Sequence, residues 1–367
     1  MENFAHTLLG LSLAKTGLER ATPMATASLV ISSNLPDIDV VMGLLGGTPA
    51  YLEYHRGLTH SFAGLFGLAV ILAFALTFVD RRFRLRRNAF QRPCRPLRLF
   101  WLAFLGGLGH LAMDSTNSYG TRPLMPASDR WFYGDLAFVL DPWIWLILGS
   151  AIVWIATNSA ARILLSGLVV ALLSLIVALA ARHPTIEHPV AVSSGVRIIW
   201  FVGLFIVIVG RALNWGRGGE KLARYAILFL ALYYGGLWLA RQEAADRARN
   251  SLPPESYLAA VWPAPANPLV WRSVAAIDGK FFTRYENILG TPSEWREMPA
   301  LEERFIAALS QSPRAQTFLK FARFISSAVE KSEDGYAIML RDARFDLRLT
   351  ARLNEDLTVR SVDVGWH

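Results

Sequence analysis

Residues 61–79 read SFAGLFGLAVILAFALTFV, a run of 19 residues without a charged side chain. About 20 consecutive apolar residues suffice for a helix to cross the hydrocarbon core of a bilayer. Two further runs of similar length, 142–161 and 163–181, also contain no charge. These three segments predict membrane-spanning helices, and they decide the fold class.

The composition of the whole chain supports the same class. Of its 367 residues, 53% are hydrophobic and only 18% are charged, and the mean hydropathy is +0.33. Soluble domains carry about 25% charged residues. This composition excludes intrinsic disorder and argues against a single soluble globule.

Weaker apolar segments extend the membrane part. Residues 99–113, 198–210 and 225–240 are short for a span, and residues 4–14 and 21–35 predict two short helices that need not cross the bilayer. We therefore predict an all-α polytopic membrane helical bundle. Residues 1–145 form its first domain, which carries the His and Asp motifs, and residues 142–240 add further transmembrane helices.

Residues 241–367 have the composition of a soluble domain. The Pro-rich stretch LPPESYLAAVWPAPANP (252–268) is expected to be a linker, and LVWRSVAAIDGKFFTRYENIL (269–289) predicts two strands around an Asp-Gly turn. The pattern over 298–324 predicts helix, and alternation over 334–354 and 357–366 predicts strands. Together these segments predict a small α+β soluble domain at the C-terminus.

The net charge of +8 resides in the first 240 residues. Residues 241–367 contain 17 Lys/Arg and 17 Asp/Glu, which leaves 20 basic and 12 acidic residues before them. Eight of these 20 are arginines between positions 81 and 98, in a segment without any acid. Basic loops flank membrane spans on the cytoplasmic side. Topology and anionic lipid therefore explain this loop better than nucleic acid does.

Counting spans onward from the arginine loop predicts the topology. A second basic loop, 211–224, falls on the cytoplasmic side as well, and the C-terminal domain falls outside. Cys94, the only cysteine, then lies in the reducing compartment. A single cysteine can form neither an internal disulfide nor a Cys-type zinc site.

Four of the seven histidines lie in the first 110 residues, and Asp37, Asp39 and Asp114 accompany them. His110 and Asp114 are four residues apart and share one helical face. An imidazole and a carboxylate in this arrangement form half of a divalent-metal site. The alternative is a simple His–Asp hydrogen bond between helices.

Two further segments hold candidate site residues. Asp37 and Asp39 follow a proline that ends an apolar run, so they are aimed inward or form a capped, solvated turn. The segment YHRGLTHS (54–61) places His55, Arg56 and His60 directly before the 61–79 span. Arg56 has the fork geometry that binds phosphate or carboxylate. The alternative is an interfacial loop that anchors the chain in the membrane.

Topology brings these candidates together. One span begins beside His60 and the next ends beside Asp114, so both residues lie at the end of the bundle opposite the arginine loop. A short loop before His55 brings Asp37 and Asp39 to the same end, and a hairpin of the N-terminal helices brings His6 there. The polar loop STNSYGTRPLMP (115–126) is a candidate cover, and weaker candidates on this side are Asp135, Asp141, His183 and His188.

Four motifs of this chain, taken in order, resemble the bacterial inner-membrane metal-dependent hydrolase family, also described as LexA-binding. They are HTLLG (6–10), LPDID (35–39), HRGLTHS (55–61) and GHLAMDSTNSYGTRPLMP (109–126). The order of His and Asp is also distantly similar to that of the zinc-dependent phospholipase C and P1-nuclease superfamily. The resemblance implies one or two divalent ions, with Zn²⁺ favoured and Mn²⁺ as the alternative. It implies as metal ligands His6, Asp37, His60, His110 and Asp114.

The function predicted is that of a metal-dependent hydrolase in the bacterial inner membrane, acting at the extracytoplasmic face on a phosphoester of a lipid or lipid-linked substrate. Asp39 and His55 are candidates for a general base or for orienting the ligands, and Arg56 for stabilising charge on phosphoryl oxygens. One alternative is a metal-handling or transport protein, whose site usually lies near the bilayer midplane. The other is a regulatory membrane protein that binds its partner through the C-terminal domain.

Overall fold

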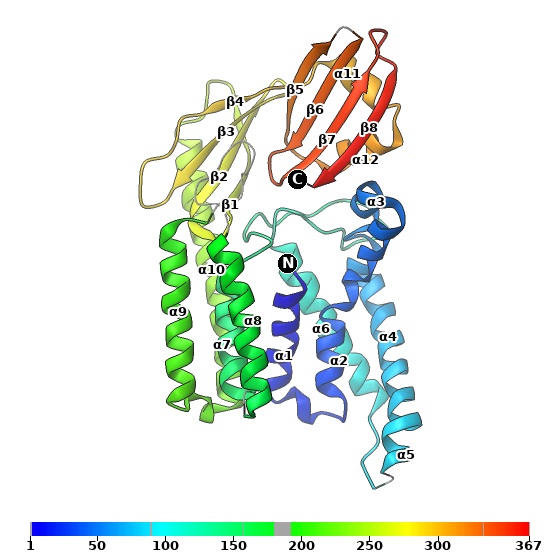
Figure 1. Ribbon diagram of the computed structural model, residues 1–367, viewed down its shortest axis with the longest axis vertical. Coiled ribbons are helices and arrows are strands. Elements are labelled where there is room, and N and C mark those ends of the chain that lie inside the picture. Colours follow the sequence, from blue (N-terminus) through cyan, green and yellow to red (C-terminus); the bar gives the residue numbers. More distant parts are fainter. Residues whose placement is uncertain (1, 89, 157, 180–191, 333, 367) are drawn as a thin grey trace.

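The computed structural model describes residues 2–88, 90–156, 158–179, 192–332 and 334–366. Figure 1 shows a bundle of helices below and two β-sheets above. The helices of the bundle are α1 (Asn3–Lys15), α2 (Ala25–Ser32), α3 (Val41–Tyr54), α4 (Phe62–Val79), α5 (Leu85–Arg87), α6 (Pro96–Ser115), α7 (Pro142–Ala156), α8 (Ala160–Leu179), α9 (Ser194–Ala212) and α10 (Glu220–Arg249). Short 3₁₀ helices, η2 (Leu35–Val40) and η3 (Leu58–His60), precede α3 and α4.

Five helical segments of the described chain are long and apolar enough to cross a membrane. They are α4 with its continuation to Arg87, α6, α8, α9 and α10. Residues 25–54 make a sixth candidate, which is bent by 45° between α2 and η2. The outer faces of these helices expose large apolar side chains such as Phe74, Leu164 and Phe205. An exposed apolar surface of this extent is typical of contact with lipid.

The predicted span over 142–161 is wrong at its C-terminal end. Helix α7 stops at Ala156 after 15 residues, which is short of a full span. The guanidinium of Arg162 donates to the Ala156 carbonyl at 3.3 Å and to Asn158 Oδ1 at 2.8 Å, and the Ser159 hydroxyl accepts from the Arg162 N–H at 3.4 Å. These polar groups close α7 and cap the start of α8.

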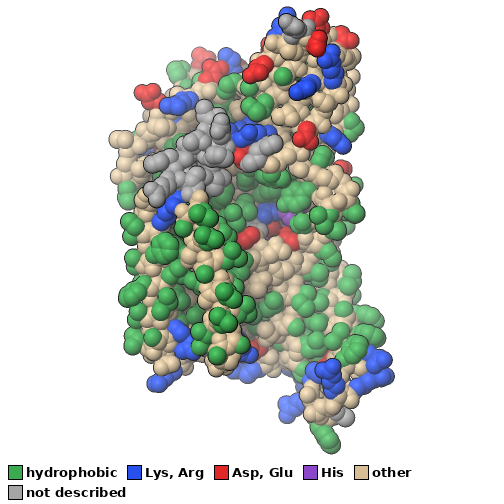
Figure 2. Space-filling view, in the orientation of Figure 1, with side chains coloured by type: hydrophobic (Ala, Val, Ile, Leu, Met, Phe, Trp, Pro, Cys, Tyr) green, Lys and Arg blue, Asp and Glu red, His purple; other side chains and the backbone are tan. Residues whose placement is uncertain are grey.

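Both basic loops lie at one end of the bundle. Arg98, the last arginine of the arginine-rich loop, donates to the Ala21 carbonyl at 2.6 Å, and Arg224, the last residue of the second basic loop, donates to the Thr16 carbonyl at 3.2 Å. The turn between α1 and α2 therefore contacts both loops. Basic side chains gather at this end in Figure 2, and the sheets lie at the opposite end in Figure 1.

The C-terminal part contains two antiparallel four-stranded sheets with strand orders β1-β2-β3-β4 and β5-β6-β7-β8. The first sheet consists of β1 (Tyr257–Ala264), β2 (Asn267–Ile277), β3 (Lys280–Asn287) and β4 (Arg296–Met298). The helices α11 (Glu303–Leu309) and α12 (Pro313–Phe321) follow, and then β5 (Ile325–Ser332), β6 (Gly335–Asp342), β7 (Leu347–Leu353) and β8 (Val359–Trp366). This confirms the membrane bundle with a small α+β domain.

Local sequence explains much of this domain, with two exceptions. The predicted Asp278-Gly279 turn joins β2 to β3, and both residues have positive φ, as a type I′ turn requires. The Pro-rich stretch, however, is not a linker, because residues 257–264 form β1; Pro263 is tolerated there since β1 is an edge strand. The helix predicted over 298–324 is broken in two, with Pro313 beginning α12.

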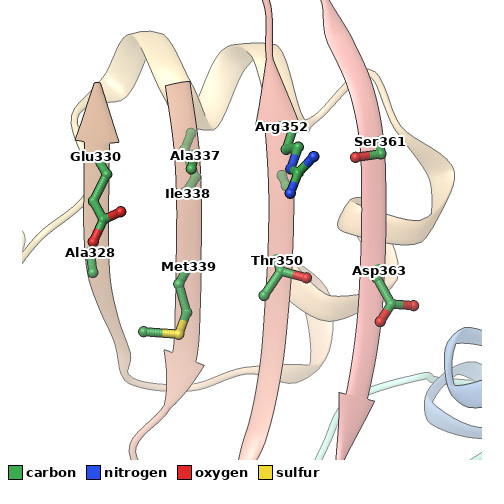
Figure 3. A pocket seen from close by; sticks show the side chains of 10 residues that line it. Ala328, Glu330, Ala337, Ile338, Met339, Thr350, Arg352, Ser361 and Asp363 are labelled. Atoms are coloured by element: carbon green, nitrogen blue, oxygen red, sulfur yellow. The ribbon is translucent and has the colours of Figure 1, made fainter. Parts of the chain in front are cut away.

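Each sheet is covered on one face by helix. In the first, Val261 and Trp271 pack with Leu237 and Ala244 of α10, which rises out of the bundle and continues past residue 241. In the second, alternate residues of β6 and β7 pack on α11 and α12. The other face of the second sheet is open and shallowly hollowed. Figure 3 shows the side chains on this open face, among them Glu330, Met339, Thr350, Arg352 and Asp363.

Candidate metal centre

The main site residues named from the sequence meet at the end of the bundle nearest the sheets. They come from the first turns of α1, from η2, from the turn between α3 and α4, and from the last turns of α6. Figure 2 shows a recess at this level in which histidine and charged side chains are visible. The residues brought together, each less than a tenth exposed, are His6, Asp37, Asp39, His55, Arg56, His60, His110 and Asp114.

Four of these residues have the spacing of metal ligands. In Asp37, His60, His110 and Asp114, one ligand atom from each lies within 4.8 Å of the others. The Nε2 atoms of His60 and His110 are 3.0 Å apart. Asp37 Oδ1 lies 3.3 Å from His60 Nε2 and 3.6 Å from His110 Nε2. Asp114 Oδ2 lies 3.4 Å from His60 Nε2 and 3.5 Å from His110 Nε2. Tetrahedral bonds of about 2.0–2.1 Å place donors about 3.3–3.4 Å apart, so the set fits a zinc-like ion.

The hydrogen bonds of the two rings show which nitrogens are available. His110 Nδ1 lies 2.8 Å from the Ser33 carbonyl, which can only accept, so we assign the ring proton to Nδ1. His60 Nδ1 lies 3.2 Å from Asp39 Oδ2, a carboxylate oxygen that accepts, so we assign a ring proton of His60 to Nδ1 as well. When both rings are neutral, the two Nε2 atoms present lone pairs to each other. Two lone pairs at this distance repel unless an electrophile lies between them, as in metal sites whose histidines are held from behind. Without a cation, burial lowers the pKa of His60, but its hydrogen bonds to Asp114, Asp37 and Asp39 outweigh burial and raise that pKa to about 10, so His60 Nε2 then carries a proton.

Asp39 lies behind the cluster and holds the turn that carries His60. Its Oδ1 accepts from His55 Nδ1 at 2.8 Å, and its Oδ2 accepts from the Thr59 hydroxyl at 2.6 Å and from the Arg56 backbone N–H at 3.0 Å. Burial lowers the pKa of His55 below its usual value, although the bond to Asp39 opposes this shift. His55 is therefore neutral near pH 7, with its Nδ1 proton directed at Asp39.

Arg56 is committed to contacts inside the protein. One terminal nitrogen donates to Asp114 Oδ1 at 3.0 Å and the other to Asn117 Oδ1 at 2.8 Å. The guanidinium also lies 4.6 Å from the ring centroid of Tyr119. Of its nitrogens, Nε is buried and has no hydrogen-bond partner among the described residues. The sequence predicted that the Arg56 guanidinium binds phosphate, whereas in the structure the same nitrogens donate to Asp114 and Asn117.

The charges of the cluster leave a deficit that a divalent cation would fill. Three buried carboxylates, Asp37, Asp39 and Asp114, face one permanent cation, Arg56. With neutral histidines, two negative charges are uncompensated in a buried site. Uncompensated buried charge is strongly unfavourable. The residues present thus fit one divalent ion in charge as well as in donor spacing.

His6 lies next to the four-donor group rather than inside it. Its ring stacks on that of His110 with centroids 3.8 Å apart, and its Nε2 is 3.3 Å from Asp114 Oδ1. Neither ring nitrogen makes a well-aligned hydrogen bond with the described residues, although the ring is fully buried. Its predicted role as a ligand stays a prediction.

Sequence reasoning missed several supporting groups. The Ser33 carbonyl carried no local signal, because its role depends on a ring 77 residues away. Thr59 was expected at most to cap the following helix, whereas Ser61 is the cap and Thr59 donates to Asp39. Asn117 and Tyr119 fall within the polar loop that was expected to cover the site, and both contact Arg56.

The weaker candidates take structural roles where they can be seen. Asp135 forms an ion pair with Arg323 at 2.9 Å. Asp141 Oδ1 accepts from the Trp143 N–H at 2.9 Å as a helix cap. His183 and His188 lie outside the described residues.

The C-terminal domain is bonded to the loop that covers the site. Arg344 is fully enclosed, pairs with Asp342 at 2.6 Å, and donates to the Ser118 carbonyl at 2.9 Å and to the Phe321 carbonyl at 2.7 Å. Since Asn117 adjoins Ser118 and binds Arg56, a continuous set of contacts runs from the second sheet to the cluster.

Comparison with known proteins identifies the first half of the chain. A family model described as YdjM inner membrane protein matches residues 1–185, which contain every residue of the cluster. We found no match among curated proteins or among solved structures. The resemblance to the inner-membrane family is thereby confirmed, whereas similarity to the zinc-dependent phospholipase C superfamily stays a prediction. The match and the apolar helices indicate a multi-pass inner-membrane protein. The chain belongs to the YdjM inner membrane protein family.

Proposed function

We propose that this protein is a membrane-bound metal-dependent hydrolase that cleaves a phosphoester of a lipid or lipid-linked substrate. One observation carries the proposal: two histidine Nε2 atoms, both held from behind, face each other at 3.0 Å with two carboxylates beside them. Buried donors in this arrangement, with an excess of negative charge, suit a divalent ion.

The metal ligands proposed are Asp37, His60, His110 and Asp114, with His6 as a further ligand suggested by the family resemblance. A Zn²⁺ or Mn²⁺ ion bound there would supply Lewis acidity, and Zn²⁺ would lower the pKa of its bound water to about 7. The donor set of two imidazoles and two carboxylates is compatible with either ion.

The remaining residues position the ligands and handle protons. Asp39 orients His60 and the turn around it, since its oxygens already accept three bonds. His55 is the proposed proton acceptor, because its Nδ1 donates to Asp39 and its Nε2 retains a lone pair. Arg56 holds Asp114 in place and contributes positive charge toward the developing charge of the reaction.

The position of the cluster supports a substrate at the membrane surface. The cluster lies at the ends of the helices, opposite both basic loops and on the side of the C-terminal domain. We place this side outside the cytoplasm, since the arginine loop is the cytoplasmic one by charge. A location at the helix ends disfavours transport, for which a site at mid-membrane is usual. Reporter fusions at Cys94 and at the C-terminus test the sidedness, and a cytoplasmic report from both would refute it.

Metal analysis followed by a turnover screen tests the proposed reaction. Protein purified without chelator should hold stoichiometric Zn²⁺ or Mn²⁺ and should hydrolyse at least one phospholipid or lipid phosphate. His110→Ala should remove both properties, whereas the exposed control Asp356→Asn should retain both. Turnover of no phosphoester, or turnover that survives both chelation and His110→Ala, would exclude a metal-dependent hydrolase.

A further inference from the structure

A cavity of about 620 Å³ separates the membrane part from the C-terminal domain. Its walls are the end of α3, the loop 116–141 and one face of α12. Small-molecule sites have volumes of about 300–1,000 Å³, so this space suits a ligand group of the size of a lipid headgroup. It is formed only when the C-terminal domain sits on the membrane part.

The cavity is lined by an excess of cations. Arg122, Arg130 and Lys320 line it together with two carboxylates, Glu53 and Asp129. In the described part of the chain, none of the three cations has a carboxylate partner in an ion pair. Unpaired cations that converge on a cleft attract anions into it. The two carboxylates limit the excess to one charge.

One of these cations is held firmly between the cavity and the metal centre. The Arg122 guanidinium donates to the Glu53 carbonyl at 2.6 Å and lies 4.7 Å from the Trp131 ring centroid. Its backbone N–H donates to the Arg56 carbonyl at 3.2 Å. Arg122 thus lines the cavity and bonds to the backbone of the segment that carries Arg56 of the cluster.

An aromatic side chain forms the partition between the two sites. The Tyr119 ring packs against His55 on the cluster side and against Phe321 of the cavity wall, with centroid distances of 5.4 and 4.8 Å. The Tyr119 hydroxyl is buried and has no hydrogen-bond partner among the described residues.

We propose that this interdomain cavity binds a phosphate group of the substrate, with Arg130 and Lys320 as its principal contacts and Arg122 as the fixed cation next to the metal centre. Guanidinium forks and ammonium groups both suit phosphate oxygens. The inference rests on the proposed function for the identity of the substrate, but binding of phosphate to the cavity can be measured without turnover. It also assigns the C-terminal domain a role, since Lys320 belongs to α12.

Titration of the purified full-length protein with inorganic phosphate tests the site. The double variant Arg130→Ala/Lys320→Ala should bind phosphate at least tenfold more weakly than the unaltered protein, because charge-assisted hydrogen bonds are lost. The matched control Arg296→Ala/Lys331→Ala removes the same charges from exposed positions of the C-terminal domain outside the cavity and should bind as before. Equal affinity in all three proteins, or an equal fall in both variants, would overturn the proposal.

Two further arms identify the source of phosphate and separate this site from the metal centre. In nanodiscs of phosphatidylcholine, added phosphatidate should compete with inorganic phosphate if the ligand is a lipid headgroup, and should not compete if it is a soluble phosphate. His110→Ala should retain phosphate binding even if no substrate is ever turned over. Loss of binding in His110→Ala with normal binding in the cavity variant would place phosphate at the metal cluster and refute the cavity site.

Discussion

Asp114 is the residue on which most contacts of the cluster converge. Its Oδ2 lies 3.4 Å from His60 and 3.5 Å from His110, while its Oδ1 accepts from Arg56 and lies 3.3 Å from His6. Asp114 and His110 come from one helix, four residues apart, so a change in either alters the same group of donors.

We expect Asp114→Asn to release the metal while the protein stays in the membrane. The amide keeps the size of the side chain but removes the charge that a divalent ion requires, and the apolar length of the spans still drives insertion. Metal content and the metal concentration needed for turnover measure the effect. The double variant with His110→Ala should lose little more activity than either single change, because residues that act as a unit are not additive. Stoichiometric metal in Asp114→Asn would mean that the pair is only a structural hydrogen bond.

At the scale of elements, the close approach of α2 and α6 places the Ser33 carbonyl against His110. A Cβ atom on Gly106 of α6 would lie 2.9 Å from the Leu29 carbonyl and 2.1 Å from Ser32 Oγ. Only glycine allows this separation without movement of the backbone. The orientation of His110 therefore depends on the packing of two helices.

We expect Gly106→Leu to push α2 from α6 and to reduce metal occupancy without preventing membrane insertion. Overpacking of this kind costs about 1–3 kcal/mol, and the Ser33–His110 bond should lengthen. Metal analysis and thermal unfolding of the purified variant measure the two effects. Gly67→Leu is the control, because nothing lies within 4 Å of a Cβ added there. Equal metal content in both variants would show that His110 is oriented independently of α2.

At the scale of the whole molecule, the second sheet supports the metal centre through Arg344. This residue connects Asp342 to the Ser118 carbonyl, beside Asn117, which binds Arg56. The C-terminal domain is thus part of the structure that holds the cluster.

We expect the double variant Asp342→Asn/Arg344→Met to weaken metal binding roughly fivefold, the equivalent of one hydrogen bond of about 1 kcal/mol. Removing both charges avoids an unpaired buried ion, which would itself unfold the domain. Metal affinity by competition with a chelator measures the effect. The exposed pair Lys280–Glu297 is the control, changed to Met and Gln. Unaltered affinity in both would mean that the domain does not support the cluster.

The sequence by itself determined the membrane class, most of the spans and the residues that meet in the cluster. These depend on local quantities: the length of an apolar run, the four-residue spacing of His110 and Asp114, and the parity of spans on either side of a basic loop. Only the tertiary structure decided which group performs which task. The partner of His110 Nδ1 is a carbonyl 77 residues away, and Arg344 reaches the Ser118 carbonyl 226 residues away. Backbone carbonyls are present at every position, so no residue type marks the ones that a fold will use. The packing of distant segments therefore decides the histidine tautomers, the linkages between the domains and the break after α7.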